Sequence, residues 1–336
     1  MLKPKVGSGL RWDDIIGHKR QIQVLRAGLE ASRTPHAYLF VGEPGVGKGS
    51  VADVYTRALT CNEPDAAERP CGRCTSCRVP LDRHPDVITV TPDGSSIRID
   101  QVRAVQRRLL FRPDLGRSLV VRIDPADALT EQAQNALLKS LEEPPAYVTF
   151  ILLSHHLHAL LSTIRSRCVK LRFGRVKVQD IAEALVERGY DVERAKALAA
   201  LSFGRPGSLA ESDAEDVLAR RQRIVEWGER LLTDRCAVWY VGEAVDKERD
   251  LAQDHIDMLI LWLRDVLLVR TGRQEAVTNQ DLLDRLRQSA RNASPSGLTE
   301  AIEALMQLKE HWNANANFRL ALDVALIKAQ RGLRSA

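Results

Sequence analysis

A glycine-rich segment near residue 45 has the residue types and spacing of a loop that binds phosphate. Residues 42–48 read GEPGVGK and lie between the apolar run 38–41 and the helix-like stretch 50–59. In this strand, loop, helix order the glycines let backbone N–H groups turn towards an anion, and the lysine ammonium reaches the terminal phosphates of a nucleotide. A turn of glycines without a ligand is the alternative. The residues that we expect to contact phosphate are Gly42, Gly45, Gly47 and Lys48.

The position that would bind magnesium differs from that of a loop that hydrolyses ATP. Such a loop places Ser or Thr after the lysine, because that hydroxyl binds Mg²⁺, but this chain has Gly49 there. Ser50 follows one residue later, rotated by about 100° around the helix, so it should point away from the ion. The first magnesium contact is therefore missing.

The second half of such a site is a strand that ends in an acid. Asp124 follows the apolar run 118–123 and is the candidate metal-side carboxylate, but the next residue is Pro125, which cannot polarise an attacking water. Asp127 fits a turn or cap aspartate better than a replacement base. The loop and the strand end together predict a domain that has the fold of an ATPase but does not hydrolyse ATP. They leave open whether ATP binds.

Four of the six cysteines have the spacing of a metal site, C-x9-C-x2-C-x2-C. Two residues between thiolates let consecutive turns aim sulfur at one tetrahedral centre, and four thiolates leave no open position for water. Clustered cysteines in a reducing cytosol are more often metal ligands than disulfides. We therefore predict a structural zinc module over residues 61–77 in preference to redox chemistry, and we expect His84 to be an ordinary surface residue. The expected zinc ligands are Cys61, Cys71, Cys74 and Cys77.

The third chemical candidate is Arg167, in the segment Ser166-Arg167-Cys168. An arginine at the edge of a nucleotide-binding domain can be offered in trans to the γ-phosphate of a neighbour, where it stabilises transition-state charge. A single arginine is more often part of a surface salt bridge, so the residue pattern alone leaves both roles open. Cys168 has the character of a small buried residue.

Alternating apolar runs and amphipathic stretches must position these residues. A helix is expected at 133–143, capped by Thr130, ended by Pro144 and packed by its alanines and leucines on a sheet. The repetition of strands and helices predicts a parallel sheet. The predicted strands are residues 36–41, 86–90, 118–123 and 148–153.

Strand signals stop after residue 173, and the rest of the chain is predicted to be helical. We expect three packed units: an α/β domain at 1–173, a small helical unit at 174–225 and a larger helical bundle at 226–336. Apolar spacings of three and four predict helices at 180–188, 192–201, 214–232, 250–270, 279–290, 298–312 and 318–331.

Composition excludes several classes of protein. The 336 residues are 44% hydrophobic and 28% charged with a net charge of +5, which argues against disorder, a small disulfide scaffold and a dedicated nucleic-acid binder. Aromatic residues make up 5%, too few for a base-stacking platform. Neither a targeting segment nor a run long enough to span a membrane is visible. We expect a cytoplasmic protein.

The run NALLKSLEEPP at 135–145 brings these motifs together. In order with the glycine loop, the four cysteines and the Ser-Arg-Cys segment, it resembles bacterial clamp-loader subunits of DNA polymerase III. The resemblance is dense in motifs over residues 12–172 and only architectural beyond. It implies an α/β AAA+ parallel-sheet domain with an inserted zinc module, followed by a small helical lid and an all-α collar domain.

Within this family the resemblance leaves a choice between a hydrolysing motor of the gamma/tau type and a non-hydrolysing stator. The motor is expected to carry Ser or Thr after the loop lysine, Glu after the strand Asp and an arginine in the lid. This chain has Gly49, Pro125 and Gly207 at those positions, with Arg205 close but offset. The departures favour the stator, and the resemblance then implies that Arg167 enters the ATP site of the adjacent motor.

The stator interpretation also implies partners. These are gamma/tau and delta subunits in a hetero-pentamer, the sliding clamp indirectly, and primed DNA through the complex. The residues leave two rivals, an active motor and a nucleic-acid adaptor with a zinc module, which ATP turnover or salt-sensitive DNA binding by the lone chain would favour.

Two surfaces are candidates for contact with these partners. The collar helix at 257–270 has an apolar stripe that packs against sister subunits or, equally well, within its own domain. A predicted basic helix face could meet DNA phosphate, although a solvated face is more common. The stripe is Leu259, Trp262, Leu263 and Val266, and the basic residues are Arg103, Arg107 and Arg108.

Overall fold

The computed structural model describes residues 11–211, 214–310 and 317–334. The chain forms two compact units, Met1–Asp191 with Gly204–Glu211 and Val192–Phe203 with Ser212–Ala336. The predicted division at 173/174 and 225/226 stays a prediction, and one continuous helix, α10, crosses residue 225.

The first unit is built on a five-stranded sheet in the order β2-β3-β4-β1-β5, in which all neighbouring strands are parallel. Tyr38 of β1 lies opposite Ile151 of β4 on one side and Val169 of β5 on the other. The parallel α/β prediction and its four strands are confirmed. The strands are β1 (Ala37–Val41), β2 (Val87–Val90), β3 (Leu119–Ile123), β4 (Val148–Ser154) and β5 (Val169–Arg172).

The fifth strand, β5, was absent from the sequence prediction. It has four residues and forms an edge of the sheet, and Leu171 is its one buried side chain. An edge strand that is solvated on one side carries a short and weakly apolar pattern. The sequence pattern was therefore too weak to predict this strand, which is formed by pairing with β1.

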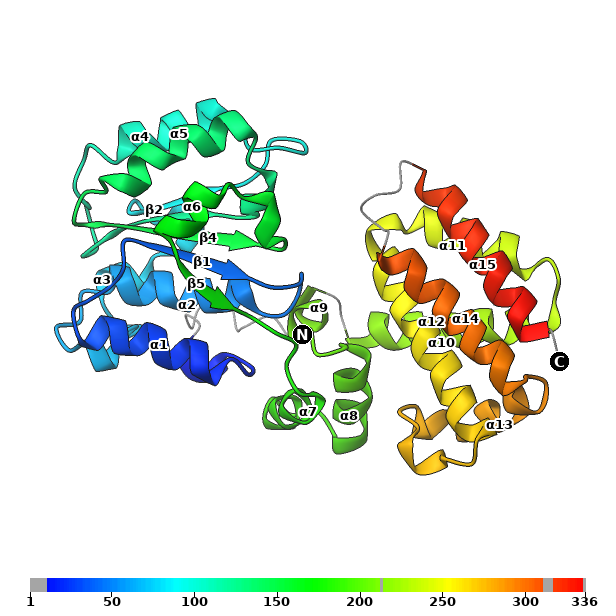
Figure 1. The fold of residues 1–336 in the computed structure, drawn as a ribbon. Coiled ribbons are helices and arrows are strands. Elements are labelled where there is room, and N and C mark those ends of the chain that lie inside the picture. Colours follow the sequence, from blue (N-terminus) through cyan, green and yellow to red (C-terminus); the bar gives the residue numbers. More distant parts are fainter. Residues whose placement is uncertain (1–10, 212–213, 311–316, 335–336) are drawn as a thin grey trace. The chain divides into compact units, whose positions relative to one another are not determined.

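Each face of the sheet packs against its own layer of helices, because successive strand residues point to opposite faces. Leu119, Val121 and Ile123 share one core with helices α4 and α5, whereas Val120 joins the other core with α1 and α2. Figure 1 shows α4 and α5 on one side of the sheet and α1 and α2 on the other. These helices are α1 (Lys19–Glu30), α2 (Lys48–Thr60), α4 (Ile99–Arg108) and α5 (Glu131–Glu142).

Shorter helices complete this unit, and among them α3 contains Cys77 and α6 contains Arg167. They are α3 (Thr75–Arg78), α6 (Ser162–Arg167), α7 (Val178–Glu187) and α9 (Pro206–Glu211). Helix α5 begins after Thr130, whose side chain accepts a hydrogen bond from the Ala133 N–H, and its Ala133, Leu137 and Leu141 lie in the core. The predicted cap and the predicted sheet-facing side of this helix are confirmed.

The second unit is helical throughout its described residues. Helix α11 was not predicted, and neither was α9 of the first unit, which lies between the predicted helices 192–201 and 214–232. None of the described helices is both long and apolar enough to cross a membrane. The helices of this unit are α8 (Val192–Leu201), α10 (Ala214–Thr233), α11 (Ala237–Lys247), α12 (Ala252–Arg270), α13 (Leu283–Arg291), α14 (Pro295–Glu310) and α15 (Phe318–Arg334).

The predicted apolar stripe of the collar lies on α12 and is buried inside its own unit. All four residues of the stripe are at most 1% exposed, and α12 packs against α10, α13 and α14. They are therefore not available to a sister subunit, and the alternative of packing within the domain holds. The large apolar side chains that are exposed in the described part of this unit lie elsewhere, and they are Val192, Trp239, Tyr240, Met306, Leu320 and Val324.

Candidate functional site

The glycine loop leads from the end of β1 into the start of α2, as the sequence predicted. Gly45 and Gly47 have φ values of 76° and 108°, a backbone region that glycine enters without strain. Lys48 is 5% exposed, and its ammonium donates to the carbonyl oxygens of Gly42 (2.6 Å) and Glu43 (2.8 Å). Burial lowers the pKa of Lys48 to about 8, against the opposing pull of nearby carboxylates. The lysine is thus bound to its own loop.

The first turn of α9 packs directly on this loop. The Gly207 N–H donates to the carbonyl oxygen of Gly45 at 2.7 Å, and a Cβ atom on Gly207 would lie 2.7 Å from that same oxygen. Arg205 is buried, and its Cβ lies 3.5 Å from where a Cβ on Gly45 would be. Residue 207 is the lid position at which a motor subunit is expected to carry an arginine. In this chain the backbone of Gly207 contacts the backbone of Gly45 there.

An ion-pair group occupies the side of the loop where the magnesium contact was expected. The guanidinium of Arg122, on β3, donates to Asp124 at 2.7 Å and also to Asp53. Arg122 Nη2 lies 3.4 Å from where a Cβ on Gly49 would be. Ser50 is exposed, as expected for a side chain rotated away from the loop. Sequence reasoning missed Arg122, which lies on β3, and Asp53, which lies on α2 beyond the loop motif.

Asp127 holds the end of β4. It accepts hydrogen bonds from the Ser154 hydroxyl and from the His155 N–H (2.6 Å). These partners are 27 and 28 residues away, so the expectation that it caps its own turn was wrong. Because its carboxylate is engaged in this contact, the geometry gives it a structural role.

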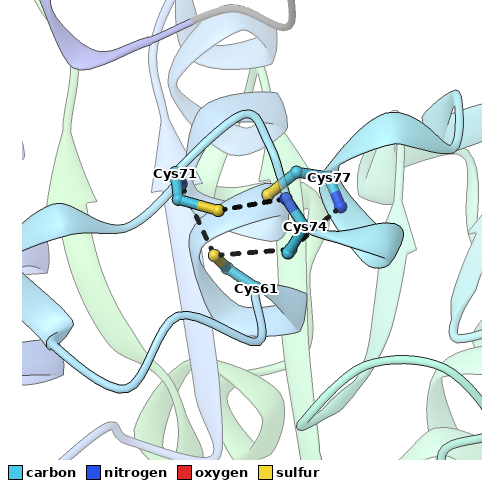
Figure 2. A group of neighbouring side chains, drawn as sticks. All are labelled: Cys61, Cys71, Cys74 and Cys77. Atoms are coloured by element: carbon cyan, nitrogen blue, oxygen red, sulfur yellow. Dashed lines mark hydrogen bonds between the residues drawn. The ribbon is translucent and has the colours of Figure 1, made fainter.

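The four cysteines converge, although they span seventeen residues of chain (Figure 2). Their sulfur atoms all lie within 4.8 Å of one another, and those of Cys61 and Cys74 are 3.9 Å apart. Four thiolates 2.3 Å from one zinc ion lie about 3.8 Å from each other. All four cysteines are free thiols in this structure. The donor set therefore fits a metal ion such as zinc.

Backbone N–H groups point at these sulfur atoms, as they do around thiolates. Cys61 Sγ accepts from the N–H groups of Glu63 and Cys71, each at 3.4 Å, and the N–H of Cys77 donates to Cys74 Sγ. A hydrogen bond from Cys77 and these backbone donors lower the pKa of Cys61 to about 4. The cluster is arranged to hold negative charge, which a bound cation would neutralise.

His84 is buried beside this cluster and supports the helix that carries Cys77. The expectation that it is a surface residue was wrong. It is 4% exposed, its Nε2 donates to the Ser76 hydroxyl (2.9 Å), and its Nδ1 accepts from the Asp86 N–H (3.1 Å). Ser76 in turn donates to the Thr60 carbonyl at the end of α2. Burial lowers the pKa of His84. The histidine thereby ties helix α3, which begins after Cys74 and contains Cys77, to the segment that leads into β2.

Arg167 ends helix α6, and its side chain is 34% exposed. Its guanidinium contacts Glu142, the last residue of α5, at 2.5 Å and donates to the Thr163 carbonyl at 3.0 Å. Cys168 is buried, as predicted, and burial raises its pKa to about 12. Arg167 is thus held at the surface by one carboxylate and remains partly accessible.

The three basic residues of α4 do not share one face. Arg103 and Arg107 line the same groove as Leu110 and Lys139. Arg108 instead binds Asp86, a fully buried carboxylate, and Asp114. Only Arg103 and Arg107 remain on the face that could meet an anion.

Two family descriptions cover most of the chain. Residues 17–177 match the family described as DNA polymerase III, delta subunit. Residues 221–331 match the family described as DNA polymerase III, delta subunit, C terminal. The two matched segments include the glycine loop, the cysteine cluster, Arg167 and most of the helical unit.

Individual relatives separate two kinds of subunit. DNA polymerase III subunit delta′ of Bacillus subtilis is 29% identical over 318 residues, which cover 93% of this chain and 96% of the relative. Subunit delta′ of Escherichia coli is 30% identical over 295 residues, with 85% of each chain covered. Subunit tau of E. coli is 33% identical over 203 residues, but these cover 59% of this chain and 31% of tau. Similarity to delta′ therefore extends over most of both chains.

Proposed function

The chain belongs to the family of DNA polymerase III delta′ subunits, and on this basis we propose that it is the non-hydrolysing stator of a clamp loader. In this role it supports the loading of a sliding clamp on primed DNA during replication. The AAA+ description of its sheet unit, the lid at 174–225 and the collar at 226–336 are parts of this proposal.

One observation carries the non-hydrolysing part. At the glycine loop, Lys48 donates to the loop's own carbonyls, Gly49 offers no hydroxyl, and Asp124 is bound by Arg122. Catalysis of phosphoryl transfer depends on a positioned metal ion and on a residue that orients the attacking water. Pro125 supplies neither function. The loop has the shape of a nucleotide site, formed by Gly42, Gly45, Gly47 and Lys48, without the groups that hydrolysis requires.

We assign Arg167 as the residue that this subunit offers to a neighbour. It is partly exposed at the end of α6, and one surface carboxylate, Glu142, holds it. An exposed ion pair contributes little free energy, so a polyphosphate with a higher charge can displace Glu142. Arg167 would then stabilise charge in the transition state of an adjacent gamma/tau subunit.

The partners follow from the family. We propose a hetero-pentamer with gamma/tau and delta subunits, in which this chain reaches the sliding clamp and DNA through the complex. The collar contacts would use the exposed apolar residues of the helical unit, because the stripe on α12 is buried. The cysteine cluster would hold zinc in a closed, structural site.

The test is reconstitution with purified tau and delta subunits and a sliding clamp. Arg167→Ala should leave the complex assembled and lower its DNA-stimulated ATPase by about tenfold or more, because a trans arginine contributes strongly to turnover. Arg172→Ala, an exposed arginine on β5, is the matched control and should retain the wild-type rate. Equal rates for the two variants would disprove the trans role of Arg167.

The alternative is an active gamma/tau-type motor, which the 33% identity to tau favours. The isolated chain distinguishes the two. A motor would turn over ATP with magnesium and lose this activity in Lys48→Ala, whereas the stator should show no turnover above that of the variant.

A further inference from the structure

The guanidinium of Arg122 is enclosed by two carboxylates at the start of helix α2. It donates to Asp124 at 2.7 Å and to Asp53 of α2. Its side chain is 18% exposed, and those of the carboxylates are 31% and 30% exposed. Burial disfavours the charged guanidinium, but both carboxylates outweigh burial, and the pKa of Arg122 is raised. The arginine is therefore a permanent cation at this place.

The same guanidinium borders the glycine after the loop lysine. A Cβ atom on Gly49 would lie 3.4 Å from Arg122 Nη2, already in van der Waals contact with it. A serine or threonine oxygen would extend further from that Cβ. A metal-binding hydroxyl at residue 49 and the guanidinium of Arg122 thus compete for neighbouring space.

The residues present do not fit a magnesium ion. Mg²⁺ requires an octahedral shell of oxygen atoms at 2.0–2.1 Å and is usually held by one or two carboxylates and water. Here the two nearest carboxylates already accept hydrogen bonds from Arg122, and Lys48 adds a second positive charge that Asp124 attracts. A divalent cation would have to displace the guanidinium and would be repelled by it.

We propose that Arg122 is the resident cation of this loop: paired with Asp53 and Asp124, it takes the place of a divalent metal and excludes one. This proposal deepens the non-hydrolysing part of the proposed function by naming the residue responsible. In this proposal metal binding is prevented by Arg122 of β3 as well as by the missing hydroxyl at Gly49 of α2. It also links Gly49 and Arg122, two residues that are distant in sequence.

Manganese binding by the full, zinc-loaded chain tests the proposal, because free Mn²⁺ is measured directly by electron paramagnetic resonance. The wild type should bind no Mn²⁺ that depends on Asp124. Arg122→Ala should free both carboxylates and gain a site at least about tenfold tighter, since unpaired carboxylates are good ligands of hard cations. The double variant Arg122→Ala/Asp124→Asn should lose this gain. Arg103→Ala, an exposed arginine on α4, is the control and should behave as wild type.

Two further variants keep the test decisive. Arg122→Gln removes the charge but retains a hydrogen-bond donor for Asp124, so it serves if Arg122→Ala does not fold. Adding Gly49→Ser to either variant should tighten Mn²⁺ binding again, because the hydroxyl then has room. Wild-type Mn²⁺ binding that Asp124→Asn abolishes would overturn the proposal, and so would an absence of any gain in the Arg122 variants.

This experiment is independent of assembly. Mn²⁺ binding is measured on the isolated chain, whereas the trans role of Arg167 is measured as ATPase in the complex. A failure of the metal test therefore leaves the stator role standing, and an unchanged ATPase in Arg167→Ala leaves the assignment of Arg122 standing.

Discussion

Helix α2 has one motif at each end, and the two motifs differ in how far apart in the sequence their contacting residues lie. At its start, the glycine loop meets Arg122 of β3 and Gly207 of α9. At its end, Cys61 joins three cysteines that all follow within sixteen residues. The first motif depends on distant elements, and the second is nearly complete in one segment.

This difference shows how far spacing along the chain predicts which side chains meet. The cysteine spacing already contains all four sulfur donors, so the fold needs only to bend one segment to bring them together. The glycine loop has its spacing intact, but a guanidinium from another strand holds the acid that would serve a metal. Spacing along the chain therefore predicts a cluster of side chains most directly when all of its members lie inside one segment.

The largest expected effect concerns the cysteine cluster. Cys74→Ser should abolish stoichiometric zinc binding and lower the melting temperature of the sheet unit by about 10 °C or more, because binding of a structural metal contributes directly to folding free energy. Zinc content and thermal unfolding measure this. Cys236→Ser is the control, because this cysteine is exposed and lies outside the cluster. Full zinc retention in Cys74→Ser would show that the cluster is not a four-thiolate site.

A smaller effect is expected where α9 meets the glycine loop. Gly207→Ala places a Cβ about 2.7 Å from the Gly45 carbonyl, so this contact should open at a cost of about 1–3 kcal/mol. Hydrogen exchange at residues 42–48 and 204–211 should accelerate. The control is Gly174→Ala, whose Cβ would meet nothing within 4 Å. Unchanged protection in Gly207→Ala would remove α9 as a support of the loop.

The smallest effect is a pH dependence that compares one histidine at each motif. Burial lowers the pKa of both His18 and His84 below the ordinary value of about 6.5. The unfolded chain therefore binds protons first, and stability that is complete above pH 6.5 is lost as the pH falls towards the folded pKa values.

The two histidines should differ in how protonation affects their contacts. Protonated His84 can no longer accept from the Asp86 N–H, whereas His18 can still donate to the Val46 carbonyl. Urea unfolding at pH 7.5 and pH 5.5 measures this, and His84→Gln should reduce the pH dependence more than His18→Gln does. The reverse order would contradict the assignment of hydrogen-bond donors and acceptors.

Local pattern was sufficient for the main elements of the sheet unit. Four strands, the capped helix α5 and the four converging cysteines all follow from periodicity and spacing over fewer than about twenty residues. Such signals survive in a single sequence because each depends on neighbours along the chain. The edge strand β5 was missed because its four residues include one buried apolar side chain and so give a weak pattern. Its strand structure depends on pairing with β1.

Tertiary structure decided the features that join distant residues. The amino-acid order alone determined the α/β class, the glycine loop, the clustering of four cysteines and the absence of a hydroxyl at residue 49. Only the fold placed Arg122 between Asp53 and Asp124, buried His84 beneath the cysteine helix and enclosed the stripe on α12. The physical reason is that burial and ion pairing depend on what other elements bring near a side chain, which spacing along the chain does not encode.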